Sequence, residues 1–228
     1  MLSDDTEHAI FVAQCLLRSP ADSKIFSRCL AWCLRGWLLG LPAGIGLATL
    51  RAICKLWLGF PPSHSGVSSA GNGPAMRAAI IGAFFPEDRV RRLDFLTAST
   101  RLTHTDPKAL IGASAITELA ALIVRDHPMQ RPALNAFIEL LRSCGSQDRE
   151  WLAIVEDIER AARSDSTVAE LADRLGISQG VTGYIYHTVP IAAYAWFRHF
   201  GDFRTTLTEV LNCGGDTDTT GAIVGALA

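Results

Sequence analysis

Apolar residues recur at helical spacing along most of this 228-residue chain, and no segment shows the strict alternation of a half-buried strand. Ile10, Ala13, Leu16 and Leu17 follow the helical pattern in the first segment, and the pattern continues to the last residues. A chain without strand patterns must build its core from helices. The sequence therefore predicts an all-α fold, a single compact orthogonal bundle of about ten helices over residues 1–228.

Capping residues and prolines mark the boundaries of several predicted helices. We expect helices over residues 6–18, 23–39, 87–101, 107–124 and 184–200, and three more between residues 130 and 175. Asp106 followed by Pro107 is a strong start signal, and Asp202 is expected to cap a further helix. Trp32 and Trp37 are predicted to lie on the core side of the second helix.

Composition and charge narrow the classes of function. Hydrophobic residues make up 49% of the chain and charged residues 19%, which suits a packed globule. The net charge of −2 provides no basic field for nucleic acid or an anionic membrane, so neither partner is expected. An uncharged, apolar-rich stretch, residues 36–50, is shorter than the roughly 20 residues that span a bilayer, and we interpret it as buried protein.

The six cysteines show no paired spacing typical of a metal finger or a redox motif. Cys29 and Cys33 lie one helical turn apart, and we interpret them as packed thiols rather than zinc ligands. The acidic N-terminus does not resemble a signal peptide. Unpaired cysteines without a signal peptide predict a cytoplasmic location.

Two acidic clusters near the ends of the chain carry the strongest chemical signal. They are Ser3–Thr6, before the first predicted helix, and Gly214–Thr219, at the start of the last one. Each could serve simply as a helix cap. Crowded carboxylates nevertheless repel one another unless a cation binds, and oxygen ligands suit Mg²⁺, Mn²⁺ or Ca²⁺. If the fold brings the two ends together, they could hold two metal ions, but spacing alone leaves this open.

These two clusters and three further motifs resemble motifs of the ADP-ribosylglycohydrolase family, and they occur along the chain in the family's order. The three motifs are Ser-Ala-Gly-Asn-Gly-Pro-Ala-Met-Arg at 69–77, Leu-Thr-His-Thr-Asp-Pro at 102–107 and Gly-Tyr-Ile-Tyr-His-Thr-Val-Pro at 183–190. The resemblance covers nearly the whole chain. It implies the family's helical fold and a metal-dependent hydrolase that cleaves the glycosidic bond between ADP-ribose and a protein side chain or a related ADP-ribosyl conjugate.

The resemblance also implies a site, residue by residue. Two Mg²⁺ (or Mn²⁺) ions would be held by Ser3, Asp4, Asp5, Asp216, Asp218 and Thr219. The metals would orient the ribose hydroxyls and activate water, with Asp4, Asp5 and Asp218 as the catalytic carboxylates. The residues implied to bind the ligand are Gly44, Gly46, Ser69, Gly71, Asn72 and His104. Tyr184 is added because its ring could stack on a ribose or base, although a core position explains it as well.

The chain departs from the family's pattern at its ends. We expect the family's N-terminal helix and the end of its C-terminal helix to be missing. That leaves a second hypothesis, a catalytically impaired ADP-ribose-binding or structural member of the same family. A third, a haloacid-dehalogenase-like phosphatase suggested by Asp216-x-Asp218-x-Thr220, is rejected because its motif must precede a Rossmann-like domain and only eight residues follow.

Overall fold

The computed structural model describes residues 3–42 and 44–228, and this part of the chain is all-α without a sheet, as the periodicity predicts. Thirteen α-helices and one 3₁₀ helix account for its regular structure, and three isolated β-bridges join its loops. The elements are α1 (Asp4–Arg18), α2 (Ser23–Leu39), α3 (Leu47–Trp57), α4 (Pro62–Ser65), η1 (Ala75–Arg77), α5 (Ala78–Phe84), α6 (Arg89–Arg101), α7 (Pro107–Asp126), α8 (Leu134–Cys144), α9 (Arg149–Arg163), α10 (Val168–Arg174), α11 (Ile185–Arg198), α12 (Phe203–Asn212) and α13 (Thr217–Leu227).

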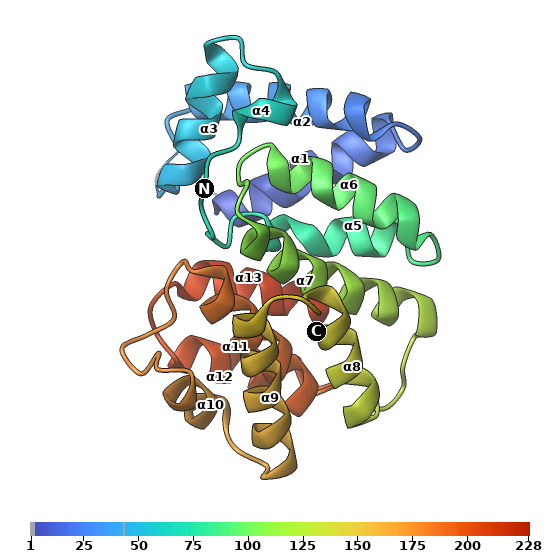
Figure 1. The fold of residues 1–228 in the computed structure, drawn as a ribbon, viewed down its shortest axis with the longest axis vertical. Helices are drawn as coiled ribbons and strands as arrows, with labels where there is room; N and C mark the ends of the chain where they lie inside the picture. The colour runs from blue at the N-terminus through green and yellow to red at the C-terminus, as the bar shows by residue number, and fades with distance from the viewer. Residues whose placement is uncertain (1–2, 43) are drawn as a thin grey trace.

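The helices form two halves that share a core. Figure 1 shows α1 to α6 in the upper half and α8 to α13 in the lower half, with α7 between them. α7 packs against α5 and α6 on one side and against α8 and α11 on the other. One continuous hydrophobic cluster includes Phe26 and Phe95 in the upper half and Trp151 and Trp196 in the lower half. Burial of this apolar surface holds the two halves together.

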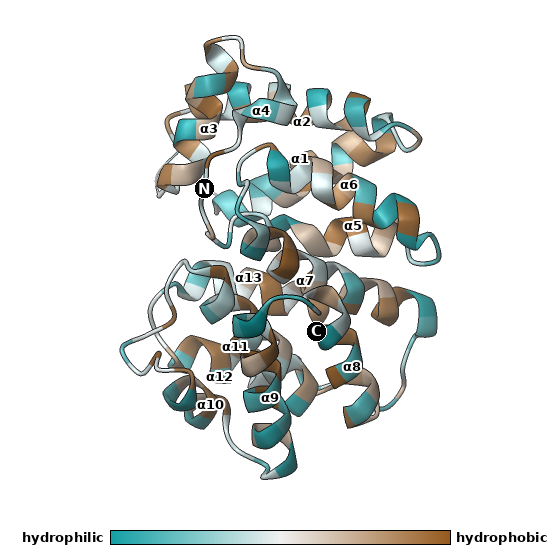
Figure 2. Cartoon of the chain, in the orientation of Figure 1, coloured by the Kyte–Doolittle hydropathy of each residue, from teal (hydrophilic) through white to brown (hydrophobic). Residues whose placement is uncertain are grey.

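α9 illustrates how the sequence pattern selects the buried side of each helix. Its buried residues recur in the i, i+3, i+4, i+7 pattern, which places them on one stripe of the helix. They are Trp151, Ile154, Val155, Ile158 and Ala161. Figure 2 shows hydrophilic residues on the outer turns of α9 and α10, away from the core.

α7 is central to the fold. Within the described residues it is the one helix long and apolar enough to cross a membrane by length and composition, and 56% of its apolar window is buried inside the protein. Asp106 caps it by accepting a hydrogen bond from the Lys108 amide, and Pro107 occupies its first turn, as predicted. Its contacts on both sides explain its apolar composition as that of a core helix.

Two predictions of burial were wrong. In the uncharged stretch 36–50, Leu39, Leu41 and Leu47 are 70%, 86% and 59% exposed, because they lie at the surface at the end of α2, just beyond it and at the start of α3. Trp37 is buried as expected, but Trp32 is 66% exposed. Helical spacing alone overestimated the width of the buried face of α2.

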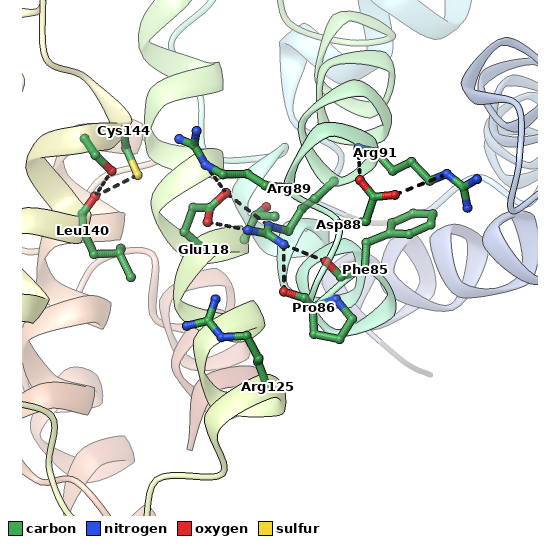
Figure 3. Close-up of polar contacts among 12 residues, drawn as sticks. Phe85, Pro86, Asp88, Arg89, Arg91, Glu118, Arg125, Leu140 and Cys144 are labelled. Atoms are coloured by element: carbon green, nitrogen blue, oxygen red, sulfur yellow. Dashed lines mark hydrogen bonds and ion pairs between the residues drawn. The ribbon is translucent and has the colours of Figure 1, made fainter.

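Arg92 and Glu118 form a buried ion pair between α6 and α7. The Nε and Nη2 atoms of Arg92 donate to the two carboxylate oxygens of Glu118 at 3.1 and 2.7 Å. Its Nη1 donates to the carbonyl oxygens of Phe85 at 2.7 Å and Pro86 at 3.1 Å. Figure 3 shows Glu118, Phe85 and Pro86 grouped around these hydrogen bonds. Each charged group has its partners, so the pair fixes α6 against α7.

Candidate functional site

The first and last helices place the two acidic clusters side by side. α1 begins at Asp4 and α13 begins at Thr217, and the two helices contact each other. One carboxylate oxygen from each of Asp4, Asp5 and Asp218 lies within 4.8 Å of the others. The two chain ends therefore meet, a contact that the spacing in the sequence left open. Together with Asp216, these residues are called the acidic cluster below.

A loop that precedes α11 holds the turn before α13. The Val181 amide donates to the Gly214 carbonyl at 3.1 Å, and the Asp216 amide donates to the Val181 carbonyl at 2.7 Å. Gly215 has φ of +78°, and a Cβ atom there would lie 2.0 Å from the Val181 oxygen, so no side chain fits. The turn directs the Asp216 carboxylate toward Asn72, whose Nδ2 donates to it at 2.7 Å.

Asp5 is the most buried member of the acidic cluster. It is 1% exposed, and neither of its carboxylate oxygens has a hydrogen-bond partner among the residues that the structure describes. Burial, and then the charge of Asp4, raise the pKa of Asp5 to about 6, although the nearby Thr219 hydroxyl lowers it. A buried carboxylate without a partner costs free energy unless it is protonated or bound to a cation. Its two orphaned oxygens fit a hard divalent ion.

The other members of the acidic cluster also perturb one another. Burial raises the pKa values of Asp4 and Asp216, and the charge of Asp218 raises both further. A hydrogen bond from Asp216 lowers the pKa of Asp218. No Lys, Arg or His in the described parts of the chain forms an ion pair with any of these carboxylates. The local charge is therefore negative and unbalanced.

A cavity of about 330 Å³ opens beside the acidic cluster. The two chain ends contribute Asp4, Asp216, Asp218 and Thr219 to its lining. Six of the residues predicted to bind a ligand also line it, namely Gly44, Gly46, Ser69, Gly71, Asn72 and His104. With Gly183, residues from six separate parts of the chain thus surround one cavity.

Three predicted site residues do not line this cavity. Asp5 is buried, and Ser3 is exposed and caps α1. The Tyr184 hydroxyl donates to Glu150 Oε1 at 2.6 Å and accepts from Lys108 Nζ at 3.0 Å. The Tyr184 side chain is therefore held by a separate polar network, and only its neighbour Gly183 reaches the cavity.

His104 presents a fixed hydrogen-bond donor to the cavity. Arg77 Nη2 donates to Thr103 Oγ1 at 2.7 Å, and Thr103 Oγ1 lies 2.9 Å from His104 Nδ1. Because the Thr103 hydroxyl accepts from Arg77, we assign its own proton to the bond with Nδ1, which leaves the ring proton on Nε2. Burial, and then the charge of Arg77, lower the pKa of His104 to about 3, so the ring is neutral at pH 7. Nε2 faces Gly71, where a Cβ atom would lie 2.9 Å away.

Sequence reasoning missed several residues around the cavity. Thr49, Gly73, Met76 and Gly183 line it but were not predicted to. Arg77 supports it from behind, fully buried and without a carboxylate partner in residues 3–42 and 44–228, and burial lowers its pKa to about 10. A charged residue directly before the apolar segment 78–84 was a signal for this buried arginine. Gly73, Met76 and Gly183 lie inside motifs that the sequence analysis quotes, whereas Thr49 offered no distinguishing pattern.

With this geometry established, comparison with known proteins identifies the family. The model of the ADP-ribosylglycohydrolase family matches residues 1–228. The chain belongs to the ADP-ribosylglycohydrolase family. An uncharacterized protein of Archaeoglobus fulgidus is 31% identical over 230 residues, an alignment that covers 99% of this chain and 70% of that protein.

Two other similar proteins are less identical in sequence to this chain. ADP-ribosylhydrolase ARH3 of Bos taurus is 28% identical over 201 residues, covering 74% of this chain, and the match spans 52% of ARH3. A solved structure described as an ADP-ribosylglycohydrolase-related protein complex has a TM-score of 0.70 at 27% identity. It covers 100% of this chain and 70% of its own. The helical arrangement described above is thus the fold of this family.

Proposed function

We propose that this chain is a metal-dependent hydrolase that cleaves the glycosidic bond between ADP-ribose and a protein side chain or a related ADP-ribosyl conjugate. The observation that carries the proposal is the meeting of Asp4, Asp5 and Asp218 beside a cavity. The family supports hydrolysis of ADP-ribosyl conjugates in general, and the ARH3 relative is named as an ADP-ribosylhydrolase.

The proposed cofactor is a pair of Mg²⁺ or Mn²⁺ ions. The proposed ligands are Ser3, Asp4, Asp5, Asp216, Asp218 and Thr219. The orphaned oxygens of Asp5 and the missing cationic partner support a hard cation at this position. When bound, such ions supply charge neutralisation and a nucleophilic water at neutral pH.

The remaining proposed roles follow from which side chains reach the cavity. Asp4 and Asp218 line it and could accept a proton from water, whereas the buried Asp5 would act only through the metal. Neutral His104 would donate from Nε2 to a ligand oxygen, a binding role rather than proton transfer. Asn72 would hold Asp216 in place through the 2.7 Å hydrogen bond.

The test is release of ADP-ribose from ADP-ribosyl-arginine and ADP-ribosyl-serine peptides, followed by chromatography with and without Mg²⁺ or Mn²⁺. We expect turnover that requires metal, and we expect the Asp5→Asn and Asp218→Asn double variant to lose it by more than about 100-fold. Asp22→Asn is the matched control, because Asp22 is an exposed cap of α2 and asparagine caps equally well. Undiminished activity in the double variant would refute the assignment.

A catalytically impaired ADP-ribose-binding member is the second candidate. The observation in its favour is that Ser3 and Asp5 lie outside the cavity lining, while the other proposed binding residues except Tyr184 line it. A binder would take up ADP-ribose yet release none from either peptide. The same assay, combined with a binding measurement, separates the two functions.

A further inference from the structure

Three of the six cysteines converge between α1 and α2. Cys15 on α1 is buried, and Cys29 and Cys33, one turn apart on α2, are half-buried. The Cys15 sulfur lies 2.8 Å from that of Cys29 and 3.8 Å from that of Cys33. All three sulfurs lie within 4.8 Å of one another. These residues are called the cysteine cluster below.

Hydrophobic packing does not account for this geometry. A buried cysteine that serves only as packing behaves as a small apolar side chain, and non-bonded heavy atoms then sit about 3.5–4.0 Å apart. The sulfurs of Cys15 and Cys29 are closer than that. An ion placed about 2.3 Å from each sulfur would separate the sulfurs by roughly 4 Å. The 3.8 Å separation of the Cys15 and Cys33 sulfurs already matches this value, and the Cys29 sulfur would move about 1 Å away from Cys15 to join them.

We propose that Cys15, Cys29 and Cys33 bind a thiophilic metal cation, with Zn²⁺ or Cu⁺ as its chemical class. No His, Asp or Glu from the described ranges joins the three sulfurs, so thiolates alone form the protein's ligand set. Soft sulfur ligands select these ions over Mg²⁺. Cys29 and Cys33 are partly exposed, so solvent can complete the coordination of Zn²⁺. The bound ion clamps α1 to α2.

The cysteine cluster is separate from the acidic cluster. Cys15 lies ten residues along α1 from Asp5, which corresponds to about 15 Å of helix. Its soft ligands also select a different class of ion from the carboxylates. The inference therefore does not depend on the proposed hydrolase function, and either can fail without the other.

The experiment uses the reduced, metal-free full chain with excess Mg²⁺ present to occupy any oxygen-ligand site. Co²⁺ is titrated as a spectroscopic probe, because thiolate ligation gives an intense sulfur-to-metal charge-transfer band, and Zn²⁺ is then added to displace it. We expect one Co²⁺ per chain, loss of the band on addition of Zn²⁺, and a higher melting temperature of the Zn²⁺-loaded protein. The Asp218→Asn variant should behave in the same way, because its substitution lies in the acidic cluster.

The controls are cysteine substitutions inside and outside the cysteine cluster. Cys29→Ser and Cys33→Ser should each weaken Co²⁺ binding by more than about 100-fold, whereas Cys54→Ser, at an exposed cysteine on α3, should leave it unchanged. Cys15→Ser is the most buried change, so the half-buried Cys33 carries the test if that variant does not fold. Absence of the band from the reduced protein would overturn the proposal. The proposal would also be overturned if the reduced protein binds no metal but loses two free thiols on oxidation. That result would identify a redox pair.

Discussion

Two buried groups of charged residues differ in how their charges are compensated. One is the ion pair of Arg92 and Glu118, and the other is the cluster of Asp4, Asp5 and Asp218. Arg92 and Glu118 are 3% and 12% exposed at their side chains, and each charge is met by its partner or by carbonyl oxygens. Asp5 is equally buried, but within the described parts of the chain its oxygens have no hydrogen-bond partner. The first arrangement is complete as it stands, whereas the second leaves negative charge for a ligand to neutralise. Charge compensation therefore separates a structural feature from a candidate functional one.

The largest effect on stability is expected from breaking the ion pair between Arg92 and Glu118. Glu118→Gln would leave Arg92 as a buried cation without its carboxylate, and the free energy of unfolding should fall by roughly 3 kcal/mol. Urea unfolding monitored by circular dichroism measures this. Glu139→Gln, an exposed change on α8, is the control and should alter stability little. A loss below about 1 kcal/mol in Glu118→Gln would show that the pair is not a structural anchor.

A substitution in the acidic cluster is expected to leave the stability of the metal-free protein unchanged or to raise it. In chelator, Asp218→Asn should unfold at the same temperature as the unsubstituted protein or higher, because it removes repulsion among carboxylates. Mg²⁺ should then raise the melting temperature of the unsubstituted protein only, with a stabilisation of about 2.7 kcal/mol at a hundred times its dissociation constant. Thermal denaturation with and without Mg²⁺ checks both parts. Equal stabilisation of the two proteins by Mg²⁺ would contradict the proposed metal site.

A smaller effect is expected from the neutral, buried His104. Its pKa is about 3 in the folded protein and has its ordinary value of 6.5 in the unfolded chain. The unfolded chain therefore binds the proton first, and folding stability falls as the pH drops below 6.5, by up to about 1.4 kcal/mol per pH unit. His104→Gln should make this loss shallower between pH 6.5 and pH 4.5 in chelator. Equal slopes in His104→Gln and the unsubstituted protein would contradict the assignment.

Local signals predicted the helices well. Asp106 and Pro107 mark the start of α7, and Asp202 caps α12 by accepting from the Thr205 amide, as expected. Caps and prolines act within one turn of the chain, so they can be recognised in a single sequence. The predicted number of helices was too low because short elements such as α4 lie in segments that resemble loops.

Contacts between distant segments could not be predicted from local patterns. The acidic residues were found because both ends carry dense carboxylates, but only the fold brings Asp4 close to Asp218. Cys15 meets Cys29 through the packing of α1 on α2, and nothing in their spacing indicates it. Tyr184 was predicted as a ligand contact from its ring alone, and its hydroxyl instead meets Glu150 and Lys108.

The most direct test of the proposed function is calorimetric titration of ADP-ribose into the metal-free protein, first in chelator and then with Mg²⁺. The account predicts heat of binding only when Mg²⁺ is present, and loss of that heat in the Asp5→Asn variant. Identical binding with and without Mg²⁺, or no binding in either condition, would contradict the claim that the uncompensated carboxylates form a metal-dependent ADP-ribose site.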